Sequence, residues 1–462
     1  MTLIEQIAEK IVAIRHEDLP PEAVHWAKAA ILDTVGVTLA GAREDCVRIV
    51  ERVTAAESAG GGDCLLFGLG RRAPPLVAAL VNGTAAHALD YDDVSNSLGG
   101  HPSAPIVPAL FSLADSRDCC GRAFIAAYVA GFETETRIAR GVHFHHYEKG
   151  WHPTATLGVF GAAAACSHLM GLSVAQTSQA LAIAASLASG IKANFGTMTK
   201  PLHVGHTARS GLFAALLAEG GFTANDAALE HKQGFLMVYN GAGNFDAAAI
   251  LEDWGNPYDV VRPGPAFKQY PCCGSTHPAL DALLLLRESH AMPADRIARI
   301  ESWTHPRRLA HTDRPDPKTG LDAKFSVQYC LARAALQGRV RLEDFEGAAY
   351  DDPDVRRLMR HIHAAPHPDA GTANEEALGA EVRVTFTDGE VISKKVSSAL
   401  GRGPDNPMPR GALAAKFADC AGRALPTAAV ARVQGLLETL ETVASLRTVT
   451  DAIAVPAKLA AE

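Results

Sequence analysis

The 462-residue sequence lacks several features that would place it in large classes of proteins. It has no basic excess, because 43 lysines and arginines stand against 51 acidic residues and the net charge is -8. A nucleic-acid binder is therefore not expected, since no surplus positive charge is available to neutralise phosphates. The first residues include acids and lack a basic segment followed by a long apolar run, so we expect no signal peptide.

Membrane-spanning runs, zinc-binding cysteine patterns and internal repeats are missing as well. The longest apolar stretch, 157–172, is interrupted by a Ser-His pair and falls short of the roughly 20 apolar residues that a span needs. The nine cysteines include the adjacent pairs Cys119–Cys120 and Cys272–Cys273 but no C-x-x-C. This spacing suits neither a zinc site nor an ordinary disulfide framework. We predict no metal, no membrane partner and a reducing, cytoplasmic location.

Length and composition indicate a globular protein with more than one core. The chain is longer than one hydrophobic core usually supports, and its 48% hydrophobic and 20% charged residues are ordinary for a folded protein. Apolar residues recur with a helical period of about 3.6 residues through the N-terminal half of the chain. The predicted helices there cover 24–36, 78–88, 121–140, 157–170, 173–188 and 206–219.

The pattern changes after residue 265. Residues 296–304 alternate like a strand, and residues 381–387 and 390–397 flank Asp388–Gly389, a strong hairpin signal. The remaining predictions are helices at 326–336, 353–361, 412–421 and 428–440 and a linker at 401–410. The fold class is therefore predicted to be mainly α with an α+β part. A large all-helical domain comprises 1–265 and 405–462, and a smaller α+β lid domain comprises 266–404.

Two segments carry acids or histidines that could perform acid/base chemistry. Asp90 lies in an acidic helix end that is followed within a dozen residues by His101, a pattern compatible with acid/base catalysis, a metal site or plain helix-end polarity. His152 is the last of four histidines in ten residues. Because no H-x-x-x-H motif and no nearby cysteine supports zinc, we interpret that segment as a loop with one working histidine. Pro153 after it indicates a helix start, where an anion is favoured.

Two lysines and a tyrosine complete the candidates from residue patterns. Lys200 lies at a predicted helix start, with Thr199 as the capping residue, so we expect free backbone N–H groups beside the ammonium as a carboxylate cradle. Lys268 lies where the predicted domains meet, the usual place for a ligand cleft. Either lysine could instead be solvated. Tyr329, at the start of a lid-domain helix, is either a proton donor or a packing residue with a satisfied hydroxyl.

These segments together resemble the MmgE/PrpD family. The resembling stretches are NGTAAHALDYDD with HPS, GWHPTATLG, TKPLHVG, FKQYPCCGSTH and DAKFSVQY, in the family's order from residue 82 to residue 329. The resemblance implies an all-α domain with an α+β lid, a homodimer, and no metal or organic cofactor. Carried over by motif, the site residues are Asp90, His101, His152, Lys200, Lys268 and Tyr329. Two departures, Val94 and the pair Cys272–Cys273, leave the exact substrate open.

The family includes 2-methylcitrate dehydratase, cis-aconitate decarboxylase and iminodisuccinate epimerase, whose reactions all build negative charge beside a carboxylate. Lys200 and Lys268 would stabilise that charge as it forms. His152 would be the principal acid/base, and His101 its partner or a carboxylate ligand. Asp90 would orient His101 or share the proton. Tyr329 would protonate a leaving hydroxyl or the product carbon.

The predicted function is therefore a cofactor-independent lyase, a dehydratase or decarboxylase, of a small di- or tricarboxylate such as a 2-methylcitrate-like or aconitate-like acid. An isomerase or epimerase of a dicarboxylate such as iminodisuccinate is the alternative. Its base would be Cys273, because a thiolate near a lysine has a lowered pKa. A third alternative is a catalytically silent binding protein that kept the fold, and the intact motifs argue against it.

Overall fold

The computed structural model describes residues 1–368, 379–409 and 411–454, so residue 410 of the predicted linker, residues 369–378 of the predicted lid and the last eight residues lie outside it. The chain forms two compact units. The first consists of Met1–Phe267 and the stretch that begins at Arg410, and the second consists of Lys268–Pro409. The boundaries expected from the sequence lie at 265/266 and 404/405.

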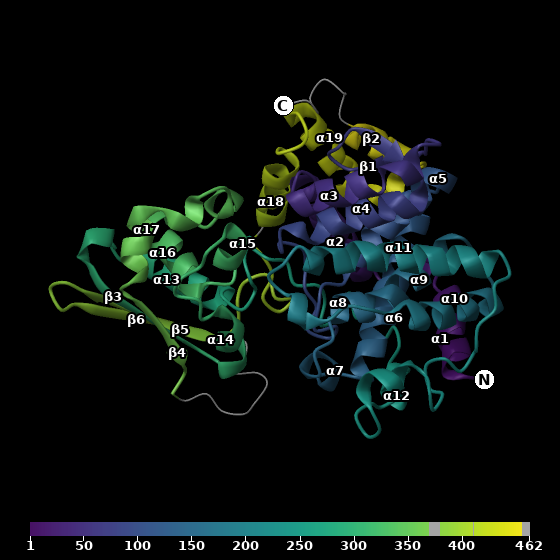
Figure 1. Cartoon of the computed structure of the whole chain (residues 1–462), viewed down its shortest axis with the longest axis horizontal. Coiled ribbons are helices and arrows are strands. Elements are labelled where there is room, and N and C mark those ends of the chain that lie inside the picture. The colour runs from purple at the N-terminus through teal and green to yellow at the C-terminus, as the bar shows by residue number, and fades with distance from the viewer. Residues whose placement is uncertain (369–378, 410, 455–462) are drawn as a thin grey trace. The chain divides into compact units, whose positions relative to one another are not determined.

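The first unit is built of helices and contains one short pair of strands (Figure 1). Its elements are α1 (Leu3–Val12), α2 (Pro21–Gly41), α3 (Asp45–Val53), β1 (Cys64–Leu66), β2 (Arg71–Ala73), α4 (Pro75–Ala88), α5 (Ser103–Arg117), α6 (Gly121–Arg140), α7 (His145–Glu148), α8 (Pro153–Thr156), α9 (Gly158–Leu169), α10 (Val174–Leu187), α11 (Thr199–Glu219), α12 (Phe235–Asn240), α18 (Ala412–Ala421), α19 (Thr427–Glu438) and α20 (Arg447–Ile453). In the part of the chain that the structure describes, no helix is long and apolar enough to cross a membrane.

The fold class predicted from the sequence, mainly α with a smaller α+β part, is confirmed. The expectation that the large domain is entirely helical misses the antiparallel β1–β2 pair, in which Cys64 lies opposite Ala73. Three residues in each strand are too few for a periodic signal, so the sequence pattern did not predict them.

Two glycines allow α4 and α11 to lie unusually close together. A Cβ added to Gly205 on α11 would collide with the carbonyl oxygen of Leu80 and the hydroxyl of Thr84 on α4. A Cβ added to Gly83 would lie 2.8 Å from the Cα of Gly205. Any larger residue would push the helices apart, because interiors are close-packed. This approach keeps the first turn of α11 beside the end of α4, where the candidate site residues lie.

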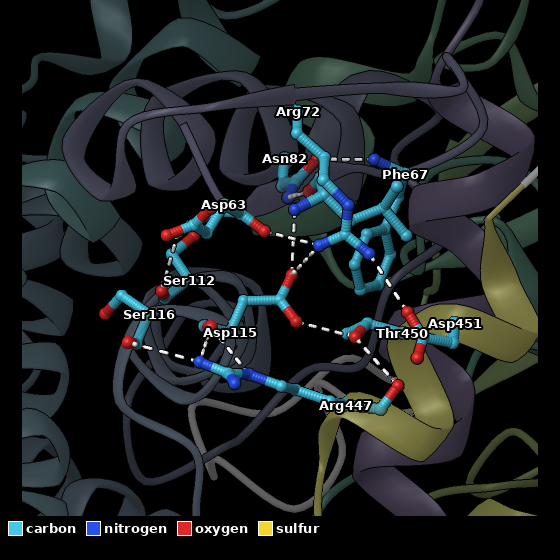
Figure 2. A network of polar contacts seen from close by, with 12 residues as sticks. Asp63, Phe67, Arg72, Asn82, Ser112, Asp115, Ser116, Arg447, Thr450 and Asp451 are labelled. Atoms are coloured by element: carbon cyan, nitrogen blue, oxygen red, sulfur yellow. Dashed lines mark hydrogen bonds and ion pairs between the residues drawn. The ribbon is translucent and has the colours of Figure 1, made fainter. Parts of the chain in front are cut away.

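A buried carboxylate joins α20, near the C-terminus, to the rest of the first unit (Figure 2). Asp115 on α5 accepts hydrogen bonds from the Leu65 amide at 2.8 Å and the Thr450 hydroxyl at 2.6 Å. The Arg447 guanidinium donates to the Asp115 carbonyl, and Arg72 lies 3.7 Å from the carboxylate. Buried polar groups need such partners. Asp115 thus connects α5, β1 and α20 within one unit.

The second unit combines a four-stranded mixed sheet with helices. The strand order is β4–β3–β5–β6; β3 is parallel to β4 and antiparallel to β5, and β5 is antiparallel to β6. α13 packs against β5 and β6, and α16 packs against α13 and β4. The elements are α13 (His277–Ser289), β3 (Ile297–Thr304), α14 (Pro306–Thr312), α15 (Gly320–Ala323), α16 (Val327–Gln337), α17 (Pro353–Met359), β4 (Ile362–Pro366), β5 (Ala380–Phe386) and β6 (Val391–Val396).

Candidate active site

Histidines, acids and a lysine converge in the first unit from segments that are far apart in the sequence. Some lie at the end of α4 and in the loop that follows it. The others lie just before α5, just before α8 and in the first turn of α11. Each of them is at most 9% exposed. We call this set the His–Asp–Lys cluster; its members are His87, Asp90, Asp92, His101, His152 and Lys200.

Lys200 forms a buried ion pair with Asp90. Its Nζ lies 2.5 Å from Asp90 Oδ1. Asp90 adopts a left-handed backbone conformation with φ of 53°, which is uncommon for a residue other than glycine but is tolerated by aspartate. Its amide donates to the His87 carbonyl at 3.2 Å, so a tight turn ends α4. Strained residues of this kind are concentrated at functional sites, where the surrounding structure holds them in place.

Asp92 lies between two imidazoles. Its Oδ2 is 2.8 Å from His87 Nδ1 and 3.0 Å from His101 Nδ1, and the two rings are in edge contact with their centroids 4.5 Å apart. Burial alone would raise the Asp92 pKa, but His101 and His87 together hold it well below its usual range. Burial lowers the pKa of His87 to about 4, so this ring is neutral at pH 7. Asp92 therefore orients both imidazoles, while Asp90 Oδ1 lies 3.7 Å from His101 Nε2.

His152 lies beside these histidines and has one ring nitrogen without a hydrogen bond among the described residues. Its amide donates to the Gly190 carbonyl at 3.1 Å, and its Nδ1 lies 3.2 Å from His203 Nδ1. Its Nε2 is buried and has no hydrogen-bond partner among the described residues. Burial, followed by the nearby His87, Lys200 and other histidines, lowers the pKa of His152 well below the usual value. The ring is therefore neutral at pH 7 and can accept a proton.

The loop that carries His101 is fixed to the segment after His152. The His101 amide donates to the Thr154 hydroxyl at 3.0 Å. The preceding Gly100 fits closely against the same residue, because a Cβ there would lie 2.8 Å from the Thr154 amide nitrogen and hydroxyl oxygen. His101 and His152 are thus positioned by one shared contact region, which limits their relative movement.

Four members of the cluster have the chemistry of metal ligands. Atoms of His87, Asp90, Asp92 and His101 that can bind a cation all lie within 4.8 Å of one another. However, the Lys200 ammonium already lies against Asp90, and a divalent cation placed there would be repelled at short range. The Lys200 ammonium thus takes the place that a metal cation would have beside these ligand atoms. An experiment that tests the prediction of a metal-free site is given below.

The expectation of free backbone N–H groups beside Lys200 is wrong. Met198, not Thr199, precedes the first helical residue, and no side chain caps α11. The amides of Thr199 and Lys200 donate to the side chain and carbonyl of Thr197, and Pro201 has no N–H. Lys200 therefore contacts this cluster through its ammonium group.

Lys268 and Cys273 belong to the second unit, and both are buried. The Cys273 amide donates to the Lys324 carbonyl at 2.9 Å, which fixes the loop before α13. The sulfur of Cys273 interacts electrostatically with the guanidinium groups of Arg308 and Arg402. The surroundings of Cys273 are therefore basic, and the reactive thiolate stays a prediction.

Tyr329 is a core residue of the second unit. Its side chain is fully buried within the hydrophobic cluster that α13, α16 and the sheet form. Its hydroxyl donates to the Asp344 carbonyl and accepts from Arg333 Nε at 2.9 Å. Burial raises its pKa to about 12. These contacts favour the packing role over the proton-donor role, because the hydroxyl is already engaged on both sides.

The sequence analysis missed three residues of the site. Asp92, rather than Asp90, is the carboxylate that hydrogen-bonds His101, and His87 shares it. His203 lies beside His152. A signal for His203 was present, because residues three apart on a helix share a face and His203 follows Lys200 by three. His87 lies in the last turn of α4 and Asp90 lies beyond its end in a left-handed conformation, so no shared helix face indicated His87.

Comparisons with known proteins agree with this architecture. The model of the MmgE/PrpD N-terminal domain matches residues 5–248, and that of the MmgE/PrpD C-terminal domain matches residues 270–442. Cis-aconitate decarboxylase from Homo sapiens is 29% identical over 413 residues, which cover 87% of this chain and 84% of that protein. Cis-aconitate decarboxylase from Aspergillus terreus is 26% identical over 471 residues, which cover 96% of this chain and 94% of that protein.

Proposed function

The chain belongs to the MmgE/PrpD family, and from this premise we propose that it is a lyase of a small di- or tricarboxylate that needs no metal or organic cofactor. Its similarity to cis-aconitate decarboxylases supports a carboxylate lyase, and an aconitate-like acid is the first candidate substrate. The His–Asp–Lys cluster is the observation that carries the proposal. It combines a fixed cation with a neutral imidazole, that of His152, whose buried Nε2 has no hydrogen-bond partner in the described part of the chain.

Lys200 supplies the charge stabilisation. When a carboxylate leaves as carbon dioxide, the electron pair of the broken carbon–carbon bond stays on carbon and spreads into a neighbouring carboxylate. An ammonium that is already in place stabilises this charge without reorganising during the reaction. Asp90 holds the ammonium at 2.5 Å and limits its movement.

His152 moves the proton. The carbanion-like carbon must take up a proton after carbon dioxide leaves, and an imidazole is suited to deliver it near neutral pH. The free enzyme keeps His152 neutral. A bound polycarboxylate brings negative charge, which raises a histidine pKa and lets the ring carry the proton it donates. His101, oriented by Asp92, binds a substrate carboxylate or partners His152.

Dehydration is the second candidate, and the neutral state of His152 favours it. A dehydratase begins by removing a proton from a carbon beside a carboxylate, and a neutral imidazole with a free nitrogen is ready to accept it. The hydroxyl group of the substrate then takes up a proton, which the imidazolium formed at His152 can supply, and leaves as water. The same cation at Lys200 would stabilise the intermediate charge.

An epimerase of a dicarboxylate remains the alternative from another class. It needs a second base on the opposite face of the stereocentre, and Cys273 in its basic surroundings is the candidate. A silent binding protein is the least supported alternative, because the cluster is intact. Lys268 is proposed as a second ligand for a substrate carboxylate.

We also propose that the protein works as a homodimer in the cytoplasm and acts on a small molecule. Light scattering coupled to size-exclusion chromatography tests the dimer. A mass near 48.7 kDa, that of one chain, at working concentration would contradict it.

A panel of polycarboxylates tests the function. The purified chain is incubated separately with cis-aconitate, 2-methylcitrate and iminodisuccinate, and the products are followed by proton NMR and carbon dioxide release. The proposal predicts net release of carbon dioxide or water from one of the first two acids. Inversion without net release would indicate the epimerase, and no reaction with any of them would contradict the lyase.

A further inference from the structure

We propose that Lys416 is a positioning residue of the candidate active site, because its ammonium fixes the loop that carries Asp90 and Asp92. The inference deepens the proposed function and rests on it for the role of that loop in the reaction. Lys416 lies on α18, 325 residues after Tyr91, and belongs to none of the sequence motifs described above.

The Lys416 ammonium is buried between two segments of the first unit. Its Nζ donates to the Tyr91 carbonyl at 2.7 Å and lies 2.7 Å from Asp33 Oδ1 on α2. It also lies 4.0 Å from the centroid of the Tyr91 ring, which is a cation–π distance. Lys416 is 7% exposed and Asp33 1% exposed. A buried charge needs partners of this kind, so the ammonium has a fixed place beside Tyr91.

Tyr91 is the residue between the two carboxylates of the His–Asp–Lys cluster. Asp90, before it, has the left-handed conformation, and Asp92, after it, lies 2.8 Å from His87 Nδ1. The Tyr91 carbonyl belongs to the peptide group that leads into Asp92. Because a peptide group is planar, a bond that fixes this carbonyl also fixes the backbone nitrogen of Asp92. Lys416 therefore acts on the directions of both carboxylates through the backbone.

The packing of α18 against α2 places Lys416 beside Asp33 (Figure 1). Gly36 follows Asp33 by three residues and so lies on the same face of α2. A Cβ added to Gly36 would lie 3.0 Å from Phe417 Cδ2 and 3.4 Å from Phe417 Cα. Phe417 follows Lys416 and is 1% exposed. The position of the ammonium is thus set by the close-packed contact of two helices.

The residues after Asp92 are held by contacts that do not involve Lys416. The Asp93 carboxylate accepts from the Ser103 hydroxyl at 2.6 Å and from the Ser103 amide at 3.3 Å. Val94 and Ala266 exchange backbone hydrogen bonds of 2.8 and 2.7 Å. These contacts stay in a variant without the ammonium. We therefore expect the loss of Lys416 to loosen residues 90–92 locally and to leave the rest of the unit folded.

Lys416→Met in the full chain tests the inference by two measurements. In the free protein, proton NMR follows the His87 imidazole N–H, which resonates far downfield when it bonds a carboxylate; its absence in His87→Gln assigns it. We expect this signal to be lost or broadened in Lys416→Met. We also expect kcat on the substrate found in the panel to fall by ~10-fold to ~100-fold, because a displacement of about 1 Å can cost about 100-fold. Circular dichroism and thermal melting check the fold.

Lys28→Met is the matched control. Lys28 also lies on α2, and its ammonium donates to the Glu438 carbonyl at 2.8 Å and lies 2.8 Å from Glu441 Oε1. It thus joins α2 to the C-terminal segment through a carboxylate and a carbonyl, as Lys416 joins α18 to α2 and Tyr91. We expect a normal His87 signal and near-normal kcat. The same losses in Lys28→Met as in Lys416→Met would overturn the inference.

A double variant separates positioning from the effect of a buried charge. Lys416→Met removes the cation beside the buried Asp33 carboxylate, which by itself destabilises a protein. Lys416→Met/Asp33→Asn removes both charges, so we expect it to be more stable than the single variant and to keep the low kcat and the altered His87 signal. Recovery of both in the double variant would overturn the positioning role. If only the double variant folds, it alone decides; failure of both to fold would also overturn the role.

An unchanged His87 signal in folded Lys416→Met, or no such signal in the wild type, would overturn the inference. The NMR measurement needs no substrate, so it separates this inference from the proposed function. A signal that depends on Lys416, with no turnover of any acid by the wild type, would keep the positioning of the loop and contradict the lyase. An unchanged signal with turnover that depends on Lys200 would keep the lyase and contradict the positioning.

Discussion

The Lys200 ammonium lies 2.5 Å from the Asp90 carboxylate, with both side chains less than 10% exposed. Burying two charges is costly, and a buried ion pair is weak evidence for stability. Asp90 also holds a left-handed backbone conformation. A cation fixed in this way, beside oriented histidines, suits a site where negative charge develops on a substrate.

Lys200→Met and Lys268→Met should each lower turnover strongly. Removing one preorganised charge donor typically raises the barrier by ~3–4 kcal/mol, or several hundred-fold in rate. Steady-state kinetics on the substrate found in the panel measures the effect, with circular dichroism to confirm folding. Lys192→Met is the control, because its ammonium donates to the Tyr147 carbonyl and contacts the Tyr147 ring. Near-normal kcat/KM in both test variants would contradict the proposal that Lys200 and Lys268 bind substrate carboxylates.

Cys273→Ala should reduce turnover only slightly. In the lyase, the cysteine is a small buried residue of the loop before α13. In the epimerase, it would be a general base, whose loss typically costs ~100-fold to ~10,000-fold. The rate of the purified variant decides between them. A collapse of turnover, while His152 still exchanges a substrate proton with solvent, would support the epimerase.

Chelation should leave the activity unchanged. The four residues with metal-ligand chemistry include Asp90, which already binds the Lys200 ammonium. The measurement is the rate after prolonged dialysis against EDTA, compared with dialysis against buffer. A loss of activity that one divalent metal restores would show that the cluster holds a cation, and the prediction of no metal would be wrong.

The stability of the protein should fall as the pH drops below 6.5, in part through His146. Burial lowers the pKa of His146 to about 4, and its ring bonds Asn240 at 2.9 Å and Thr156 at 2.7 Å. The unfolded chain binds this proton near pH 6.5 and the folded chain only near pH 4. The neutral ring therefore contributes fully to the free energy of unfolding above pH 6.5. This contribution is lost as the pH falls from 6.5 to about 4.

Between pH 7 and pH 5 this single group should remove about 2 kcal/mol from the free energy of unfolding. Urea unfolding at a series of pH values measures the slope. His146→Gln is expected to be less stable at pH 7 and to show a shallower decline toward pH 5. The exposed His363→Gln is the control. An equal decline in wild type and His146→Gln would contradict the assignment.

The sequence predicted the fold well where the local pattern was regular. The predicted helix 121–140 and the observed α6 have the same bounds, and the Asp388–Gly389 turn joins β5 to β6 as expected. The sequence analysis missed α5, because it contains Pro105 and Pro108 and is buried almost all round, which removes the polar face that periodicity needs. The short parallel strand β4 depends on pairing with β3, a contact that no local pattern encodes.

The sequence singled out several residues of the candidate site but not the contacts between them. Asp90, His101, His152 and Lys200 come together in the first unit, as the motifs suggested. Which carboxylate orients which histidine depends on the left-handed turn at Asp90, and a sequence does not show that turn. No sequence pattern pairs Arg308 with Arg402, and only the folded loop at Gly274 brings them together.

Product analysis in deuterium oxide for the wild-type chain and His152→Gln is the most direct test of the central claim, that the His–Asp–Lys cluster performs lyase chemistry on a polycarboxylate. The account predicts that the wild type releases carbon dioxide or water from an aconitate-like or citrate-like acid. A decarboxylated product would carry one deuterium at the newly protonated carbon. His152→Gln should be slower by ~100-fold to ~10,000-fold, as for the loss of a positioned acid/base. A His152→Gln variant that forms the same product at a near-wild-type rate would contradict the account.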